Sequence, residues 1–214
     1  MAEISPDDPI SAVLFDFGGV ITSSPFEAFD AFERERGLPP GFIRRLNSLN
    51  PHDNAWARLE RSQVTIEEFF DLYEAEAREA GHELDARAVL ALLGGELRPQ
   101  MVEAVRRCGE RMTIGCLTNN FVLDRTARPE IAEVLELFDV IVESSRVGVR
   151  KPEPRFYEAA CQELEIRPSQ AVFLDDLGIN LKPARQMGMT TIKVTSPEQA
   201  LADLEGVLGF PVAG

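Results

Sequence analysis

Basic residues are scarce in this sequence, and lysine is the scarcest of them. The 214 residues include 22 basic and 36 acidic side chains, so the formal net charge is −14. Only three of the basic residues are lysines, and none of them occurs before position 151. A chain this acidic repels phosphate backbones and anionic lipid surfaces, so we expect it to bind neither nucleic acid nor a membrane. A small anionic ligand remains compatible with this charge, because a local site can oppose the overall field.

Cysteines and long apolar runs are also few. The three cysteines form an odd set without a close pair, which predicts neither a disulfide framework nor a zinc site. The longest apolar stretches, such as residues 88–95, are far shorter than the roughly 18 residues of a membrane span. Residues 1–9 are acidic and lack the features of a secretory signal. We therefore expect a soluble, cytoplasmic protein, either a monomer or a homodimer.

Short apolar runs alternate with helical patterns along most of the chain. Each run is hydrophobic almost throughout, which is typical of strands buried on both faces of a parallel sheet. The predicted strands are residues 12–17, 113–118, 140–143, 171–174 and 190–194. Helical patterns of crossover length separate the last four, at residues 129–137, 152–164 and 180–187. This alternation predicts an α/β fold with a doubly wound, Rossmann-like parallel sheet.

The interval between the first two predicted strands is exceptional, because it spans about a hundred residues and contains one helical pattern after another. Residues 26–36 repeat phenylalanine along one helical face, and Thr65 with Glu68 forms a capping box. We predict a small all-helical cap domain at residues 23–97, inserted into a core domain formed by residues 1–22 and 98–214.

Acidic side chains follow two of the predicted strands. Asp16 comes after the first apolar run, and Asp175 and Asp176 come at the end of the fourth. The carboxyl ends of parallel strands meet at one edge of the sheet, where ligands bind, so these three carboxylates are expected to converge. Together they would raise one another's pKa. A divalent cation that prefers oxygen ligands, such as Mg²⁺, removes this conflict.

Phosphate-binding groups are expected at the same edge. Thr118 and Asn119 end the second strand and offer hydrogen-bond donors, and Lys151 follows the third and offers a positive charge that suits phosphate. A carboxylate such as Asp16 can then act as a nucleophile on phosphorus. Any one of these features is common in turns, but together they predict a site for phosphoryl transfer.

Four segments, in this order, resemble the motifs of the haloacid dehalogenase superfamily, most of whose members are Mg²⁺-dependent phosphohydrolases. The segments are Phe15-Asp16-Phe17-Gly18-Gly19-Val20, Leu117-Thr118-Asn119, Lys151-Pro152 and Phe173-Leu174-Asp175-Asp176. Residues 138–187 are especially similar to one branch, the phosphatase domain at the N-terminus of mammalian soluble epoxide hydrolase and its free-standing bacterial relatives. The resemblance spans nearly the whole chain, although the insertion matches only in size and helical character.

The resemblance implies a nucleophile and a metal site. Asp16 is the expected catalytic nucleophile, which forms an aspartyl-phosphate. The implied ligands of Mg²⁺ are Asp16, the main-chain carbonyl of Gly18, and Asp176. Asp175 and Asn180 are expected to hold metal-bound waters.

The resemblance also implies how a small phosphorylated metabolite is bound. Thr118, Asn119 and Lys151 are expected to bind its phosphoryl group, and Lys151 also to pair with Asp16. One position departs from the usual pattern, because Gly18 replaces the second aspartate that serves as general acid and base. A positioned general acid contributes about 10²–10⁴-fold to the rate. Its absence predicts a preference for good leaving groups, such as acyl, aryl or sugar 1-phosphates.

Two alternative functions remain open. A 2-haloacid dehalogenase also uses an aspartate nucleophile but needs neither a metal nor a second aspartate; Asp175-Asp176 argues against it, because that family usually has serine and asparagine there. A catalytically weak protein that binds phosphorylated ligands is favoured by Gly18 alone. A phosphonate-cleaving relative requires a lysine in the insertion and is excluded by the absence of lysine from residues 1–150.

Overall fold

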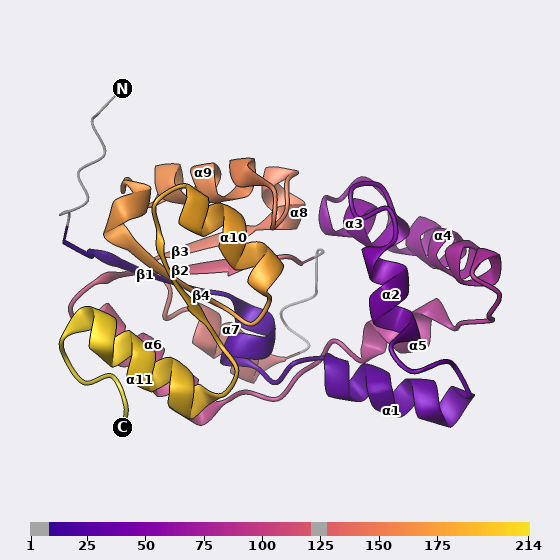
Figure 1. Cartoon of the computed structure of the whole chain (residues 1–214), viewed down its shortest axis with the longest axis horizontal. Helices are drawn as coiled ribbons and strands as arrows, with labels where there is room; N and C mark the ends of the chain where they lie inside the picture. The colour runs from indigo at the N-terminus through magenta and orange to yellow at the C-terminus, as the bar shows by residue number, and fades with distance from the viewer. Residues whose placement is uncertain (1–8, 121–127) are drawn as a thin grey trace.

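The computed structural model describes residues 9–120 and 128–214. Residues 1–9, which are not expected to form a secretory signal, lie outside the described residues except for Pro9. Five parallel strands form one sheet in the order β3-β2-β1-β4-β5 (Figure 1). Their bounds are Ala12–Phe15 for β1, Thr113–Thr118 for β2, Val140–Glu143 for β3, Ala171–Asp175 for β4 and Thr190–Lys193 for β5. The predicted α/β class with a doubly wound parallel sheet is confirmed. The first strand is shorter than predicted, because Phe17–Ile21 coils into a wide turn.

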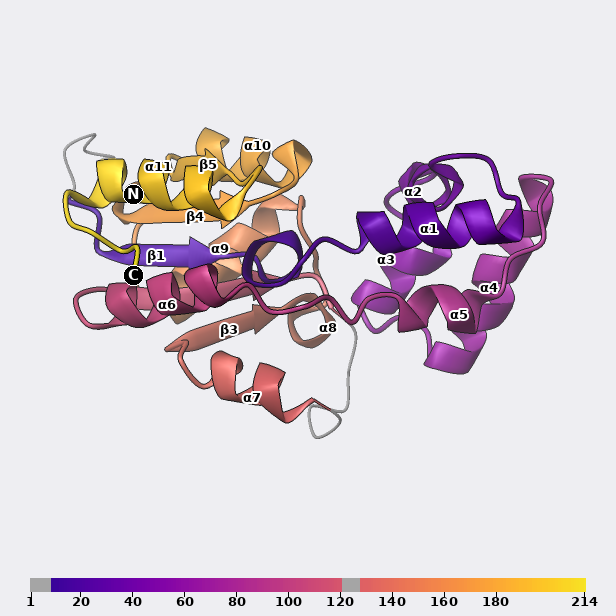
Figure 2. The ribbon, with the colours of Figure 1, turned by 90° about the horizontal axis from the view of Figure 1, so that it is seen from below.

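Helices cover both faces of the sheet (Figures 1 and 2). Three of them pack on one face: α6 (Pro99–Gly109), α7 (Pro129–Leu135) and α11 (Pro197–Leu208). The opposite face carries α8 (Ser144–Val147), α9 (Pro154–Glu163) and α10 (Gly178–Gln186). No helix within the described ranges is long and apolar enough to cross a bilayer.

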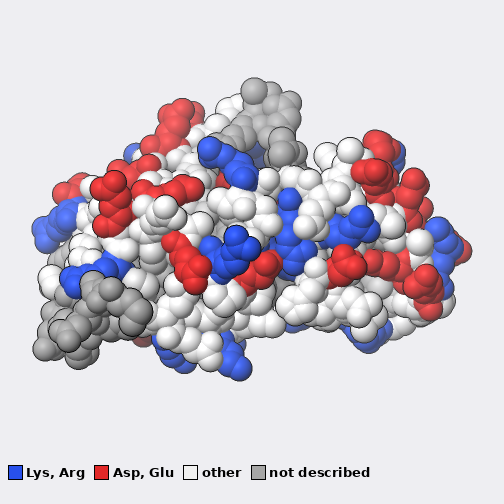
Figure 3. Space-filling view, turned by 90° about the horizontal axis from the view of Figure 1, so that it is seen from above, with Lys and Arg blue, Asp and Glu red and all other residues white. Residues whose placement is uncertain are grey.

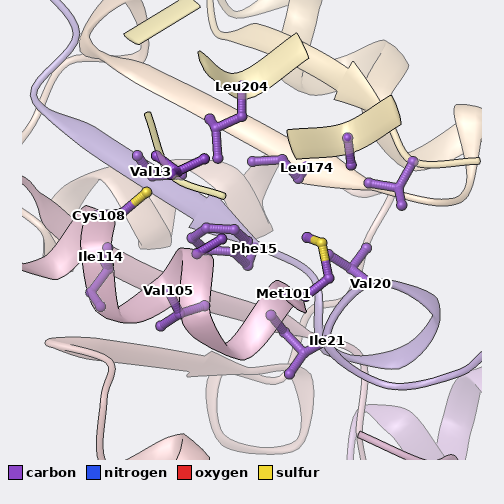
Figure 4. Close-up of a cluster of buried hydrophobic side chains, with 14 of the residues drawn as sticks. Val13, Phe15, Val20, Ile21, Met101, Val105, Cys108, Ile114, Leu174 and Leu204 are labelled. Carbon is purple, nitrogen blue, oxygen red and sulfur yellow. The ribbon is translucent and has the colours of Figure 1, made fainter. Parts of the chain in front are cut away.

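The central strand β1 contributes to both hydrophobic layers. Val13 and Phe15 point into the cluster formed with α6 and α11 (Figure 4). Ala12 and Leu14 point into the cluster on the other face. Because successive side chains of a strand alternate between faces, a strand covered on both sides is apolar at every position. All four residues are 0% exposed, which fixes β1 firmly in the middle of the sheet.

The order of the strands defines where a ligand can bind. The chain proceeds from β1 to β2 and β3 on one side, and then crosses to β4 and β5 on the other. Strand order therefore reverses at β1, and in open α/β sheets ligands bind outside the carboxyl ends of the strands at such a reversal. Asp16, Thr118 and Asp175 all lie at these ends.

The segment between β1 and α6 holds five helices that lie to one end of the sheet (Figure 1). They are α1 (Phe26–Arg36), α2 (Phe42–Ser48), α3 (Ala55–Glu60), α4 (Ile66–Glu79) and α5 (Ala86–Ala91). These helices share a hydrophobic cluster of their own, which contains Phe29, Phe69 and Tyr73. The capping box of Thr65 and Glu68 opens α4 as expected. The division into a core and a cap at residues 23–97 stays a prediction.

The two connections to this helical segment run side by side (Figure 2). Thr22 and Leu97 form an antiparallel bridge, and the Ser23 N–H donates to the Glu96 carbonyl at 2.7 Å. A Cβ atom at Gly95 would lie 2.6 Å from the Ser23 carbonyl oxygen, so only glycine allows this close approach. The helical segment therefore leaves and rejoins the sheet at nearly the same point.

Candidate active site

Asp16 follows the last residue of the central strand. Its main-chain N–H still donates to the Leu174 carbonyl at 2.8 Å, which continues the ladder to β4 for one residue. Its Oδ1 accepts from the Phe17 N–H at 2.7 Å and lies 2.8 Å from Lys151 Nζ. Both donors reach the same oxygen, so the carboxylate is held in one orientation and neither of these contacts uses Oδ2.

Lys151 is the central positive charge of the site. The side chain is 1% exposed, and Nζ lies 2.8 Å from Asp16 Oδ1 and 2.8 Å from Asp175 Oδ2. Burial lowers the pKa of Lys151, but the two carboxylates outweigh burial and hold the pKa above its ordinary value. Lys151 is therefore charged at neutral pH.

Asn119 fixes the main chain of Lys151. Its Oδ1 accepts from the Lys151 N–H at 2.8 Å, and its Nδ2 donates to the Lys151 carbonyl at 3.0 Å. The loop between α8 and α9 is thereby fastened to the end of β2. These two bonds use the carboxamide oxygen and one of the two Nδ2 hydrogens of Asn119.

Asp175 is 0% exposed and orients its neighbours through both oxygens. Oδ1 accepts from the Leu177 N–H at 2.8 Å, and Oδ2 pairs with Lys151. Asn180 Nδ2 lies 3.1 and 3.0 Å from the two oxygens. The Asn180 carbonyl in turn accepts from the Tyr157 hydroxyl at 2.6 Å, a contact that no sequence motif indicated. Asp175 and Asn180 are thus bonded to each other beside the proposed metal ligands.

Three carboxylates meet at this edge as predicted. Asp16, Asp175 and Asp176 each contribute an oxygen to a group whose atoms lie within 4.8 Å of one another. Burial raises the pKa of Asp16 well above its usual range, and Lys151 opposes this only in part. Burial and then Asp175 raise the pKa of Asp176 to about 6. Three carboxylates and one ammonium leave two negative charges when all are ionised, so this donor set fits a divalent cation.

The two glycines after Asp16 differ in what surrounds them. Gly19 has a φ of +80°, and a Cβ atom there would lie 2.3 Å from Asp176 Oδ2. Gly18 has a φ of −70°, and no atom of the described residues lies within 4 Å of the point that a Cβ atom would occupy. Glycine is therefore required at position 19, whereas position 18 has room for a side chain. Arg98, at the start of α6, donates to the Gly19 carbonyl at 2.7 Å, an anchor that sequence reasoning missed.

Thr118 ends β2 and is half-buried at the same edge. The next turn is tied to β3, because the Asn120 N–H donates to Ser144 Oγ at 3.0 Å and Asn120 Nδ2 donates to Glu143 Oε1 at 2.7 Å. Asn120 directly follows the predicted motif, but no pattern in the sequence distinguished it. All eight predicted site residues lie at or beside the carboxyl ends of β1, β2 and β4.

The fold and this set of strand-end side chains define a class of enzyme. The chain belongs to the haloacid dehalogenase-like hydrolases, whose family model matches residues 10–188. This match confirms the resemblance seen in the sequence, and the chain is a hydrolase of this family with phosphatases among its relatives.

Three curated relatives show what this chain is similar to. It is 33% identical to phosphatase MT3486 of Mycobacterium tuberculosis over 84% of this chain and 85% of that protein. It is 34% identical to mouse acyl-CoA dehydrogenase family member 10 over 94% of this chain. It is 31% identical to pig bifunctional epoxide hydrolase 2, also over 94%. The matched regions span 19% and 39% of the last two proteins, so the chain corresponds to one part of each.

Solved structures share the fold. One is the haloacid dehalogenase family enzyme BT-2542 of Bacteroides thetaiotaomicron in complex with magnesium and inorganic phosphate, with a TM-score of 0.60 and 20% identity over 86% of this chain and 93% of that one. Another is the L-2-haloacid dehalogenase PA0810, with a TM-score of 0.55 and 24% identity over 88% and 85%. Both likenesses show that the chain shares their fold.

Proposed function

We propose that this chain is a Mg²⁺-dependent phosphohydrolase that acts on a small phosphomonoester through an aspartyl-phosphate at Asp16. The observation that carries the proposal is the Asp16 carboxylate at the end of the central strand, with Oδ1 held 2.8 Å from the buried Lys151 Nζ. A relative named as a phosphatase and a structural neighbour crystallised with magnesium and phosphate support it.

The reaction would proceed in two displacements. Asp16 Oδ2 attacks phosphorus, the bond from phosphorus to the ester oxygen breaks, and the departing oxygen takes a proton from water. A second water then attacks the aspartyl-phosphate, loses its proton to solvent and releases inorganic phosphate while Asp16 is restored. Lys151, the Thr118 hydroxyl and the Asn119 N–H would bind the phosphoryl oxygens as charge shifts onto them.

Asp16, the Gly18 carbonyl and Asp176 would hold Mg²⁺. When bound, the cation supplies charge that offsets the carboxylates and the phosphoryl group. Gly18 lies in the turn that follows β1, and the contact of Arg98 with the Gly19 carbonyl keeps this turn in place.

The glycine at position 18 narrows the proposed substrate class. No side chain there can protonate the leaving oxygen, so substrates whose leaving group departs without a proton are favoured. Acyl phosphates, aryl phosphates and sugar 1-phosphates have this property. The general acid that Gly18 lacks would otherwise contribute about 3–5 kcal/mol to lowering the barrier.

The deciding experiment is hydrolysis of an aryl phosphate by the purified chain with excess Mg²⁺ and then with a chelator. We expect turnover that the chelator abolishes and that is absent in Asp16→Asn, a substitution that keeps the shape of the side chain but not its nucleophilic oxygen. Unchanged activity in Asp16→Asn would sink the nucleophile assignment.

Two further assays, halide release and phosphate binding, separate the alternative functions. Release of halide from a 2-haloacid, unaffected by chelator, would identify a dehalogenase. Absence of both activities together with Mg²⁺-dependent binding of phosphate would identify a phospholigand-binding protein.

A further inference from the structure

The helical segment touches the sheet unit through two ion pairs that cross each other. At the end of α3, Glu60 Oε2 lies 2.5 Å from Arg150 Nε, and Arg61 Nε lies 2.9 Å from Glu153 Oε1. The helical segment thus contributes the acid Glu60 and the base Arg61. The loop between α8 and α9 contributes the base Arg150 and the acid Glu153. Charged side chains of both signs gather on this part of the surface (Figure 3).

These four side chains are less exposed than ordinary surface charges, and Glu60 Oε2 and Arg150 Nε are close without the alignment of a hydrogen bond. The side chains of Glu60, Arg150 and Arg61 are 10%, 15% and 8% exposed, and that of Glu153 is 28% exposed. The indole of Trp56 donates to Glu60 Oε1 at 3.0 Å. Ion pairs shielded from solvent are screened less by salt than exposed pairs, so their loss has a larger effect.

Further hydrogen bonds join the two sides. Arg150 donates to the Pro51 carbonyl at 3.1 Å, across the junction, and Arg61 donates to the His52 carbonyl at 2.9 Å on its own side. Glu153 also accepts from the Arg150 N–H at 3.3 Å. The loop at residues 150–153 is therefore bound to the helical segment and closed on itself by the same carboxylate.

This loop carries Lys151. Arg150 precedes Lys151 directly, and Glu153 follows two residues later. Asn119 holds the main chain of Lys151 from the sheet side, with bonds of 2.8 and 3.0 Å. The crossed pairs hold the neighbouring residues from the helical side. The main chain around Lys151 is therefore held by contacts with both the sheet and the helical segment, and Lys151 Nζ lies 2.8 Å from Asp16 Oδ1.

We propose that Glu60, Arg61, Arg150 and Glu153 form a latch that docks the helical segment onto the Lys151 loop and sets the position of the Lys151 ammonium. The four are positioning residues, because they act through Lys151. The proposal rests on the proposed function for its catalytic consequence, whereas docking itself is independent of activity. Breaking the latch on the helical side should loosen a loop on the sheet side and slow phosphoryl transfer.

The test is a double-mutant cycle with Arg61→Met and Glu153→Gln in the full chain. We expect each single variant to lower kcat for an aryl phosphate about tenfold and the double variant to lose no more than either one, because coupled partners are non-additive. KM should change less than kcat, since Lys151 acts on the transition state. Arg61→Lys, which keeps the charge, should recover part of the loss.

A matched control pair is available on α6. Arg107 Nε lies 2.9 Å from Glu103 Oε1, with the same atoms and the same separation, but the pair is exposed and joins two turns of one helix. Arg107→Met and Glu103→Gln should leave kcat within about twofold of the wild type, as expected for an exposed pair.

Hydrogen exchange provides a readout that needs no turnover. In Arg61→Met, the amides of Val149, Arg150, Lys151 and Glu153 should exchange about tenfold faster, although the substitution lies in the helical segment. Multiplying effects in the double variant, or unchanged exchange in that loop, would overturn the latch. If the wild type has no phosphatase activity, the proposed function fails, and the exchange rates alone decide whether the latch exists. If Arg61→Met does not fold, as shown by circular dichroism, Arg61→Lys and Glu153→Gln carry the same measurements.

Discussion

Restoring an acid at position 18 is the most informative change to this site. Gly18 has a φ of −70° and a ψ of 128°, which any L-residue adopts without strain. Among the described residues, nothing lies within 4 Å of the Cβ position. Gly18→Asp should therefore be accepted without disturbing Asp16 or the turn.

The size of the effect should depend on the leaving group. A positioned general acid accelerates a reaction by about 10²–10⁴-fold, equivalent to about 3–5 kcal/mol of barrier. Alkyl phosphates, whose leaving oxygen must be protonated, should gain at least about 10²-fold in kcat/KM. Aryl phosphates with acidic phenols should gain only a few-fold at most, because their leaving group departs as an anion.

The assay is a series of phosphate esters of increasing leaving-group pKa, measured for the wild type, Gly18→Asp and Gly18→Asn. The slope of log kcat/KM against leaving-group pKa should be steep in the wild type and in Gly18→Asn, which fills the space without providing an acid. It should flatten in Gly18→Asp. An equal gain for every ester, or no gain for alkyl esters, would refute the argument that Gly18 marks a missing acid.

Three further predictions concern the metal site and the helical segment. Because the pKa of Asp176 is raised to about 6, its ionised form destabilises the fold above that pH. With chelator at pH 7, Asp176→Asn should therefore raise the free energy of unfolding by about 2 kcal/mol. This gain should shrink as the pH falls from 6 to 4. Added Mg²⁺ should stabilise the wild type more than this variant, and equal stabilisation in calorimetry would contradict the ligand assignment. Gly19→Ala should weaken Mg²⁺ binding at least tenfold by titration calorimetry, because its Cβ would meet Asp176 at 2.3 Å, whereas Gly206→Ala, which has open space, should not. Glu33 accepts from the N–H groups of Gly41 and Ile43 at 2.6 and 2.8 Å. Glu33→Ala should therefore lower the free energy of unfolding, measured in urea, by about 2–4 kcal/mol. Substitution of the exposed Glu35 by alanine should lower it by less than about 0.5 kcal/mol.

Much of the sheet could be predicted because its strands are buried on both faces. Residues 113–118 and 140–143 match β2 and β3 without adjustment, since a continuous apolar run between turn residues leaves little freedom in placing the ends. Helix α1 was also predicted with its observed bounds, because its phenylalanines recur at helical spacing. The structure adds that Gly37 ends it with a φ of +68°.

Two short helices of the insertion were not predicted. Helices α2 and α3 have seven and six residues, too few for a periodic pattern to stand out. Glu33, on another helix, binds the start of α2, and this contact cannot be read from local sequence. Asn54 caps α3 locally by accepting from the Ala57 N–H, a signal that was overlooked.

The candidate site likewise has a part that the sequence predicts and a part that only the structure reveals. Convergence of Asp16, Thr118 and Asp175 follows from parallel strands, whose carboxyl ends share an edge, so a sequence with ordered strands predicts it. Arg61 and Glu153 lie 92 positions apart, and Arg98 and Gly19 lie 79 apart. Pairs at such separations leave no periodic or local signature, and only the folded chain reveals them.

The antiparallel contact between Thr22 and Leu97 has a consequence for how such enzymes diversify. Because the two connecting segments touch at this bridge, the arrangement of the sheet depends on the short distance between Thr22 and Leu97. It does not depend on the number of residues inserted between them. Helical inserts of other sizes can be grafted there without changing the register of β1 against β2, and the entropic cost of a longer insert grows only slowly. The sheet, with Asp16 at the end of its central strand, can therefore keep its arrangement while the inserted helices change in length.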